Sequence, residues 1–240
     1  MFLGHYGVAF ALKRTEPRLS LGTLFLAVFL VDLMWGIFLI TGWEQARINP
    51  ELTRLTSIEF LSFPYSHGLL AGVLWAVLAA AITYSWPTRD TSRHHWIKAA
   101  IVGGAVLSHW FLDLVVHLPD LPLINDESRK VGFGLWRSLP LTLVVEALVF
   151  FGGVVIYAQW RHRGGNTRPG RLGVLVGVLI AIYAASILSP PPSRMTMVGI
   201  MCIVGSLALV AMAVWVDQRA QPVAAEARGH APSKRSHRKA

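Results

Sequence analysis

The sequence predicts an all-α membrane protein, a polytopic helix bundle with about six transmembrane helices and a short N-terminal helix. Its 240 residues are 54% hydrophobic and only 15% charged, which is too apolar for an ordinary water-soluble domain. Long apolar runs recur along the chain, and basic residues gather in the short segments between them. A bilayer is therefore expected to supply much of the solvent for this fold.

Six apolar runs reach or approach the ~20 residues that a helix needs to cross a hydrocarbon core of ~30 Å. The predicted spans are Leu19 to Gly42, His67 to Trp86, Ile97 to Leu118, Ser138 to Trp160, Leu172 to Leu188, and Met195 to Val216. Before them, a short helix over Phe2 to Lys13 could dip back into the membrane as a re-entrant segment. The pairs Gly68/Gly72 and Gly173/Gly177 predict close helix packing.

Flanking charge predicts the orientation, because cytoplasmic loops carry an excess of Lys and Arg. If the N-terminus lies inside, 16 of the 22 basic residues fall on the cytoplasmic side and the other six fall outside. This asymmetry agrees with an even number of spans. We therefore expect a multi-pass protein with both the N- and the C-terminus in the cytoplasm.

Composition divides the chain into three parts. We expect residues 1–160 to form the membrane domain that carries the site, residues 171–217 a two-helix apolar extension, and residues 218–240 a disordered basic tail along anionic lipid headgroups. The single cysteine, Cys202, lies within an apolar run, so a disulfide framework and a CxxC metal motif are both excluded. The basic residues form no continuous stripe, so nucleic acid is not an expected partner. Membrane lipid is the expected partner, and the oligomeric state is left open.

Titratable side chains lie within the predicted spans, where each costs at least ~2.5–3.5 kcal/mol near the helix centre and therefore needs a partner or a wet cavity. They are not scattered, because the last two spans contain none. In the predicted topology they all lie in the outer halves of their helices or at the outer ends. The residues are Asp32, His67, His109, Asp113, His117 and Glu146. Their convergence on one leaflet is the main functional signal in the sequence.

Spacing within the third span sharpens this signal. Residues i, i+4 and i+8 turn through only ~80° on an α-helix, so His109, Asp113 and His117 share one face. Imidazole nitrogen and carboxylate oxygen are normal zinc ligands, and a catalytic zinc uses about three of them and keeps a position open for water. At ~1.5 Å per residue, His5 lies ~12 Å along its helix from Lys13, and Asp32 lies ~20 Å along its helix from Leu19. Their depths in the membrane are therefore close enough for contact. The sequence thus predicts a site for one divalent metal ion, or two, with zinc favoured.

Several of these residues also have a structural interpretation. Asp32 could serve as the partner of a neighbouring helix, and His67 or His117 could face the headgroups from a helix end. Glu146 could be a proton-relay group, a metal ligand or a partner for a backbone donor. Asp120 is expected in the outer loop, close to His117.

Three short motifs resemble one family. They are Gly4-His5-Tyr6-Gly7, Tyr65-Ser66-His67, and Ser108-His109-Trp110-Phe111-Leu112-Asp113. These motifs are similar to elements of the bacterial inner-membrane metal-dependent hydrolases, which are sometimes described as LexA-binding. The resemblance covers roughly the first 150 residues, and the Ser-His-x-x-x-Asp element is its most specific part.

The resemblance implies a hydrolase of the bacterial inner membrane whose ligand layout is loosely similar to that of zinc-dependent phospholipase C. By this resemblance the metal ligands are His5, Asp32, His67, His109 and Asp113. The chain departs from the family pattern in having a single aspartate, Asp32, where paired aspartates are common, and a glycine directly after His67. These departures imply a reduced site, with fewer metal ions or without activity.

The first functional hypothesis is a metal-dependent hydrolase that acts on an ester or phosphoester of a membrane lipid near the outer leaflet. In this hypothesis Glu146 or His117 moves the proton. The second is a cation or proton-coupled transporter that uses the same His/Asp/Glu cluster, although the inner halves of the spans lack titratable groups that would continue a relay. The third is a structural membrane scaffold in which the polar cluster only stabilises helix packing.

Overall fold

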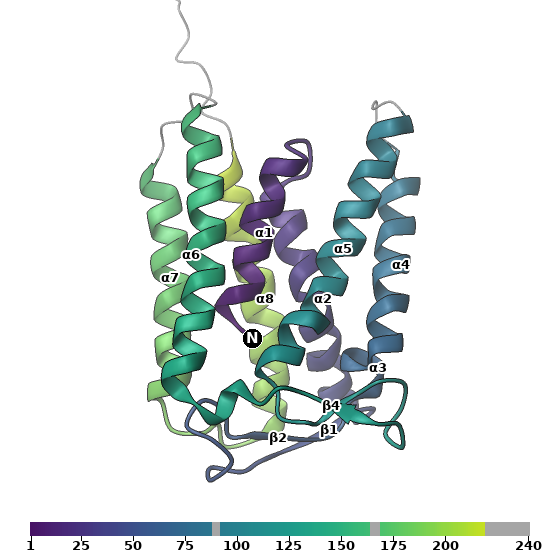
Figure 1. Ribbon diagram of the computed structural model, residues 1–240, viewed down its shortest axis with the longest axis vertical. Coiled ribbons are helices and arrows are strands. Elements are labelled where there is room, and N and C mark those ends of the chain that lie inside the picture. Colours follow the sequence, from purple (N-terminus) through teal and green to yellow (C-terminus); the bar gives the residue numbers. More distant parts are fainter. Residues whose placement is uncertain (88–91, 164–168, 219–240) are drawn as a thin grey trace, which may run out of the picture.

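The computed structural model describes residues 1–87, 92–163 and 169–218. Its helices are α1 (Leu3–Thr15), α2 (Leu21–Thr41), α3 (Pro64–His67), α4 (Leu69–Ser85), α5 (Ser92–Val116), α6 (Leu139–Arg163), α7 (Pro169–Leu188) and α8 (Met195–Asp217). Four short strands, β1 (Gln45–Ile48), β2 (Ile58–Ser62), β3 (Leu121–Pro122) and β4 (Lys130–Val131), and the 3-10 turn η1 (Leu135–Arg137) complete the fold. The long helices run side by side, and the strands lie together at one end of the bundle (Figure 1).

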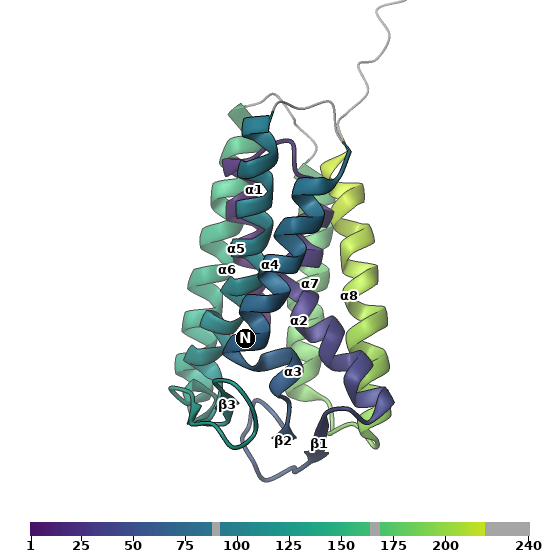
Figure 2. The ribbon, with the colours of Figure 1, turned by 90° about the vertical axis from the view of Figure 1, so that its right-hand side faces the viewer.

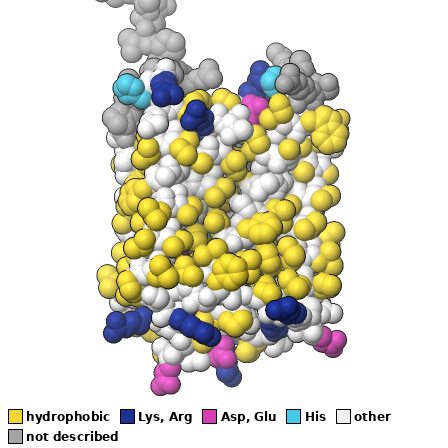
Figure 3. Space-filling model, in the orientation of Figure 1, with side chains coloured by type: hydrophobic (Ala, Val, Ile, Leu, Met, Phe, Trp, Pro, Cys, Tyr) yellow, Lys and Arg dark blue, Asp and Glu magenta, His cyan; other side chains and the backbone are white. Residues whose placement is uncertain are grey.

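All six predicted spans are helical, and the chain is a helical membrane protein. Five helices, α2, α5, α6, α7 and α8, are long and apolar enough to cross a membrane. The sixth, α4, is apolar but has only 17 residues, and it packs along α5 (Figure 2). Hydrophobic side chains cover the middle of the face seen in Figure 3, and charged side chains gather at its two ends, as expected for a membrane-spanning bundle.

The ends of α2 follow from local sequence. At its start the Ser20 hydroxyl accepts a hydrogen bond of 2.9 Å from the backbone N–H of Thr23, which is the usual N-cap arrangement. At its end Gly42 adopts a left-handed conformation with φ of +78° and donates its N–H to the carbonyl of Phe38. Glycine adopts this conformation without a steric penalty, so the helix stops there.

The short N-terminal helix α1 lies inside the bundle and not at its edge. It begins in the middle of the bundle, where the N-terminus is marked, and runs toward the end at which α8 stops (Figure 1). There the Lys13 ammonium lies 2.7 Å from the Asp217 carboxylate. Met1 and the whole first turn of α1 are buried in the bundle, and the cytoplasmic position of the two chain ends stays a prediction.

Close backbone contact with α6 holds α1 at this depth. A Cβ atom added at Gly153 would lie only 1.9 Å from the carbonyl oxygen of Gly7, and one added at Gly7 would lie 2.4 Å from that of Val149. Only glycine allows the two helices to approach so closely. This contact places the first turns of α1, and with them His5, beside α5.

The close helix contacts are not those expected from the Gly-xxx-Gly pairs. Among the described residues, nothing lies within 4 Å of a Cβ built at Gly173 or Gly177, so the prediction of close packing there is wrong. Gly36 of α2 and Gly199 of α8 approach each other instead. Helix α8 therefore packs along α2. The division of the chain into a site domain, residues 1–160, and an apolar extension, residues 171–217, stays a prediction.

The end of the bundle opposite Asp217 is closed by the strands and by α3. Strands β1 and β2 pair antiparallel, as do β3 and β4, and the sequence did not predict either pair. The span expected from His67 is interrupted, because Gly68 has an extended conformation between α3 and α4. His67 therefore lies on a separate turn, where it is buried and its ring lies 6.3 Å from that of Phe60 on β2.

Candidate metal centre

The structure brings together the titratable side chains that the sequence predicted to converge. His5 comes from α1, Asp32 from α2, His67 from α3, and His109 and Asp113 from α5, while His117 directly follows α5. The imidazoles and Asp113 are almost fully buried, whereas 23% of the Asp32 side chain is exposed. Two groups of three could each hold a metal ion, because their ligand atoms lie within 4.8 Å of one another. They are His5, His109 and Asp113, and Asp32, His67 and His109.

Asp113 lies at the centre of this cluster. Its Oδ2 atom is 3.0 Å from Nε2 of His109, 3.7 Å from Nε2 of His67 and 3.8 Å from Nε2 of His117. Its other oxygen, Oδ1, lies 3.2 Å from Nε2 of His5 and also accepts a hydrogen bond from the N-terminal ammonium of Met1. The two oxygens thus face two different sets of nitrogen atoms.

Asp32 approaches the same histidines from the side of α2. Its Oδ1 atom lies 3.4 Å from Nε2 of His67 and 3.7 Å from Nε2 of His109. His109 consequently lies between two carboxylates. The expected i, i+4, i+8 face of α5 contributes all three of its members to the cluster.

The second ring nitrogen of three histidines is held by an acceptor. Nδ1 of His109 lies 2.7 Å from the carbonyl oxygen of Val28, and Nδ1 of His117 lies 3.0 Å from Oδ1 of Asp120. Because a carbonyl oxygen and an ionised carboxylate only accept hydrogen bonds, the proton resides on Nδ1 in both rings. In the neutral form of either ring, the Nε2 lone pair then points toward the carboxylates of the cluster.

Nδ1 of His67 is also placed as a donor, through two residues that form a chain of hydrogen bonds. This atom lies 2.8 Å from the Ser66 hydroxyl, which donates its own proton to Oε2 of Glu44 over 2.6 Å. The Ser66 oxygen then accepts from Nδ1 of His67, so that Nε2 carries the lone pair when the ring is neutral. Oε1 of Glu44 also accepts the N–H groups of Tyr65 and Ser66, each at 2.8 Å.

Glu44 is itself buried, with 1% of its surface exposed. Burial raises the pKa of the Glu44 carboxyl, and the hydrogen bonds from Ser66 and Tyr65 oppose this shift. An outer partner that holds the non-ligating nitrogen of a histidine is typical of metal sites. Three of the four clustered histidines have one.

The distances in the cluster fit the donor set of a metal ion. Nitrogen and oxygen lone pairs face each other over 3.4 to 3.8 Å in four contacts, which are longer than a normal N–H···O hydrogen bond of ~2.7–3.2 Å. In a tetrahedral zinc site with bonds of ~2.1 Å, neighbouring ligand atoms lie roughly 3.4 Å apart. Among the described residues, the buried Nε2 of His109 has no hydrogen-bond partner, as expected of a ligand atom.

His5 differs from the other histidines. Its ring stacks on that of His109 with a centroid separation of 3.9 Å and an angle of 2°. Its Nδ1 atom is buried and has no hydrogen-bond partner among the described residues. His5 is therefore within reach of a metal ion, but its one hydrogen bond among the described residues joins Nε2 to Oδ1 of Asp113 inside the cluster, and no outer partner holds Nδ1.

Glu146 lies beside the cluster but points at the backbone of α1. Its Oε1 accepts the N–H of Phe2 and its Oε2 accepts the N–H of Gly4, both at 2.8 Å. Of the alternatives left open by the sequence, a partner for backbone donors is the one observed. Glu146 belongs to neither group of candidate ligands.

Two residues of the site were not predicted from the sequence. Ser66 belongs to the Tyr65-Ser66-His67 motif but had no predicted role, and Glu44 was not among the candidate residues. Asp120 was expected close to His117, and the contact of 3.0 Å confirms this expectation. Glu44 follows Gly42, the glycine at which α2 ends, by two residues. A chain that turns at this glycine keeps the next residues close to the end of α2. This closeness is the available local signal that Glu44 lies near the site.

Comparison of the chain with protein-family models, with curated proteins and with solved structures finds no match. The resemblance to membrane metal-dependent hydrolases therefore rests on the three sequence motifs alone. What stands is a helical membrane protein with a buried His/Asp cluster that could bind a metal ion.

Proposed function

We propose that this protein is a membrane-bound, divalent-metal-dependent hydrolase that acts on an ester or phosphoester of a membrane lipid. The observation that carries the proposal is that the Nε2 atoms of His67 and His109 lie 3.0 to 3.7 Å from the carboxylates of Asp32 and Asp113 in a buried cluster. Lone pairs that face one another in a buried site repel unless a cation lies between them. Zinc is the favoured ion because the donors are imidazoles and carboxylates.

In this proposal His67, His109 and Asp113 hold the ion, with Asp32 and His5 as further ligands. A bound divalent cation would supply Lewis acidity, which activates a water and polarises the scissile ester or phosphoryl group. Asp32 is the partly exposed member of the cluster, so water and substrate would enter on its side. The surrounding apolar helices favour a substrate that is already dissolved in the bilayer.

His117 is suited to move a proton. One of its ring nitrogens faces the cluster, and the other contacts Asp120, whose side chain is 21% exposed. A carboxylate that orients a histidine and stabilises its protonated form is a recurrent arrangement in general acid-base catalysis. The His117–Asp120 pair would thus pass a proton between the site and the outer surface.

Glu146 has a positioning role in this proposal. Both of its oxygens are occupied by N–H groups at the start of α1, and a carboxylate at a helix N-terminus is favourable. It would hold His5 beside His109. Proton transfer by Glu146 is the weaker alternative, because breaking these hydrogen bonds leaves buried donors without partners.

A transporter is disfavoured by the packing on the other side of the cluster. Aromatic rings fill the space along α1 between His5 and Lys13, and all are buried. Their contacts link Tyr6, Phe10, Phe25, Phe29, Phe150 and Tyr157. An ion or a proton would need a polar path through this layer.

The test is hydrolysis of lipid by purified protein in vesicles made from a bacterial lipid extract. Products are identified by mass spectrometry after incubation with and without added zinc. We expect a zinc-dependent product from the wild type and its loss in His109→Ala. His162→Ala is the matched control, because His162 is an exposed residue at the far end of α6.

The control variant should retain wild-type turnover. If the zinc-loaded wild type and His109→Ala release the same products at the same rate, the proposed hydrolase is wrong. Metal-dependent movement of ions across the vesicle membrane without any lipid product would support the transporter instead.

A further inference from the structure

A second feature of the molecule lies apart from the metal centre. An apolar groove of about 680 Å³ runs between α2, α4 and α5. Its walls are mostly aliphatic, and they include Leu26, Leu30, Leu78, Ile82, Val102 and Val106. None of the candidate metal ligands lines it.

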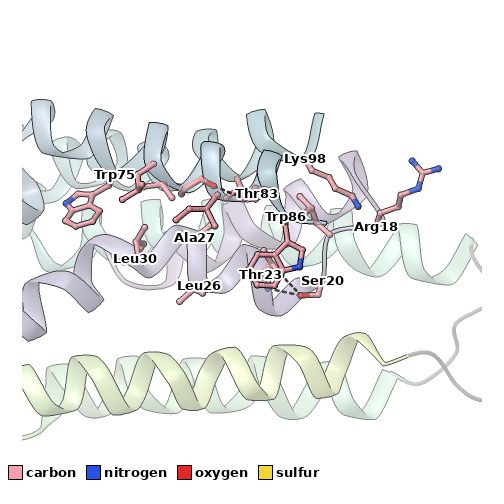
Figure 4. A pocket seen from close by; sticks show the side chains of 16 residues that line it. Arg18, Ser20, Thr23, Leu26, Ala27, Leu30, Trp75, Thr83, Trp86 and Lys98 are labelled. Carbon is pink, nitrogen blue, oxygen red and sulfur yellow. Dashed lines mark hydrogen bonds between the residues drawn. The ribbon is translucent and has the colours of Figure 1, made fainter. Parts of the chain in front are cut away.

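One end of the groove is basic and polar. Arg18 and Lys98 lie at this end, near the hydroxyl groups of Ser20 and Thr23, while Trp75 lies at the opposite end (Figure 4). Both basic side chains also interact within the protein, so any bound anion would share them. The groove thus combines a long apolar interior with positive charge at its mouth.

The length of the groove matches one leaflet of a bilayer. Along α4 its lining extends from Trp75 to Trp86, the C-cap residue, a rise of ~16 Å on an α-helix. This is about half of the ~30 Å hydrocarbon core. At the basic end Trp86 also lines the groove and is 64% exposed, as is usual for tryptophan at the headgroup level.

The positive charges at this end of the groove are complementary to an anionic headgroup. The end of the bundle with Arg18 and Lys98 is the one that the distribution of basic residues predicts to be cytoplasmic. Anionic lipids are abundant in cytoplasmic leaflets, and basic pockets between transmembrane helices bind their headgroups. A zwitterionic lipid would fill the apolar walls equally well but would gain less from the two cations.

We propose that this groove binds one anionic phospholipid of the leaflet at that end. An acyl chain lies against the aliphatic walls of α2, α4 and α5, and the phosphate lies at Arg18 and Lys98. The site is separate from the metal centre and does not depend on the proposed hydrolase activity.

The test is native mass spectrometry of the protein released from vesicles of equal parts phosphatidylglycerol and phosphatidylcholine with identical acyl chains. We expect the wild type to retain one phosphatidylglycerol in preference to phosphatidylcholine. Each cation near the membrane surface contributes about fivefold, so the double variant Arg18→Gln/Lys98→Gln should lose about 25-fold of this preference. Arg171→Gln is the matched control, because Arg171 lies at the same end of the bundle on α7, against Trp215.

A second variant tests the apolar part of the groove. Ala79→Phe adds a ring to the wall formed by α4 and leaves both cations in place. It should reduce the retention of both lipids, while circular dichroism shows unchanged helix content. Equal retention of the two lipids by the wild type, or an unaltered preference in the Arg18→Gln/Lys98→Gln variant, would overturn the proposed site.

Discussion

Nε2 of His109 lies 3.0 Å from Oδ2 of Asp113 and yet forms no hydrogen bond with it. The reason lies on the other side of the ring, where Nδ1 uses the imidazole proton to bind the carbonyl of Val28 at 2.7 Å. When the His109 ring is neutral, two buried acceptors therefore face each other. A cation between them would turn this repulsion into two favourable interactions.

Metal content is the first prediction. Detergent-purified wild-type protein should carry about one or two zinc ions per chain, as expected for a site with two overlapping ligand groups. His109→Ala/Asp113→Ala should carry none, as measured by elemental mass spectrometry under zinc-replete conditions. His162→Ala should match the wild type, and an absence of stoichiometric metal in the wild type would contradict the metal site.

Glu44→Gln should weaken metal binding without touching a ligand. The glutamine amide would donate to the Ser66 hydroxyl, which would then donate to Nδ1 of His67 and drive the ring proton onto Nε2. Loss of such an outer partner typically reduces metal affinity by ~10–100-fold. Competition with a zinc chelator measures the change.

The matched control for this variant is Glu59→Gln, which removes a carboxylate from the same end of the bundle. Glu59 pairs with Arg47 at the surface, 2.8 Å away, and takes no part in the cluster. Equal zinc affinities in Glu44→Gln, Glu59→Gln and the wild type would show that Glu44 does not determine which ring nitrogen of His67 carries the proton.

Glu146→Gln distinguishes a positioning role from a proton-transfer role. The amide can accept from only one of the two N–H groups of Phe2 and Gly4, so one buried donor loses its partner at a cost of about 1–3 kcal/mol. We expect a lower thermal unfolding temperature and a parallel loss of bound zinc and of turnover. Full zinc content with abolished turnover would instead assign proton transfer to Glu146.

Gly153→Ala should destabilise the protein through the contact between α1 and α6. The added methyl group would overlap the carbonyl of Gly7, and such overpacking costs about 1–3 kcal/mol or more. Thermal unfolding in detergent measures the effect. Gly152→Ala is the matched control, since nothing lies within 4 Å of a Cβ at Gly152 among the described residues, and equal stability of the two variants would contradict the close contact.

The helical membrane fold and much of the candidate site could be predicted from the sequence alone. Apolar runs are a one-dimensional property, because each transmembrane helix satisfies its own backbone hydrogen bonds. The same holds for the shared face of His109, Asp113 and His117, since helical spacing places i, i+4 and i+8 together. The high cost of titratable groups in a bilayer also marked Asp32, His67 and Glu146 as residues in need of partners.

Only the tertiary structure decided which partners these residues find. Glu146 contacts the start of α1 because Gly7 and Gly153 bring the backbones of α1 and α6 together. The Gly-xxx-Gly spacing had predicted close packing at other glycines. The roles of Glu44 and Ser66 depend on how the chain folds back after α2 and β2. Hydrogen-bond direction and ring tautomer depend on distances of a few tenths of an ångström between segments far apart in the chain, and local sequence does not encode these distances.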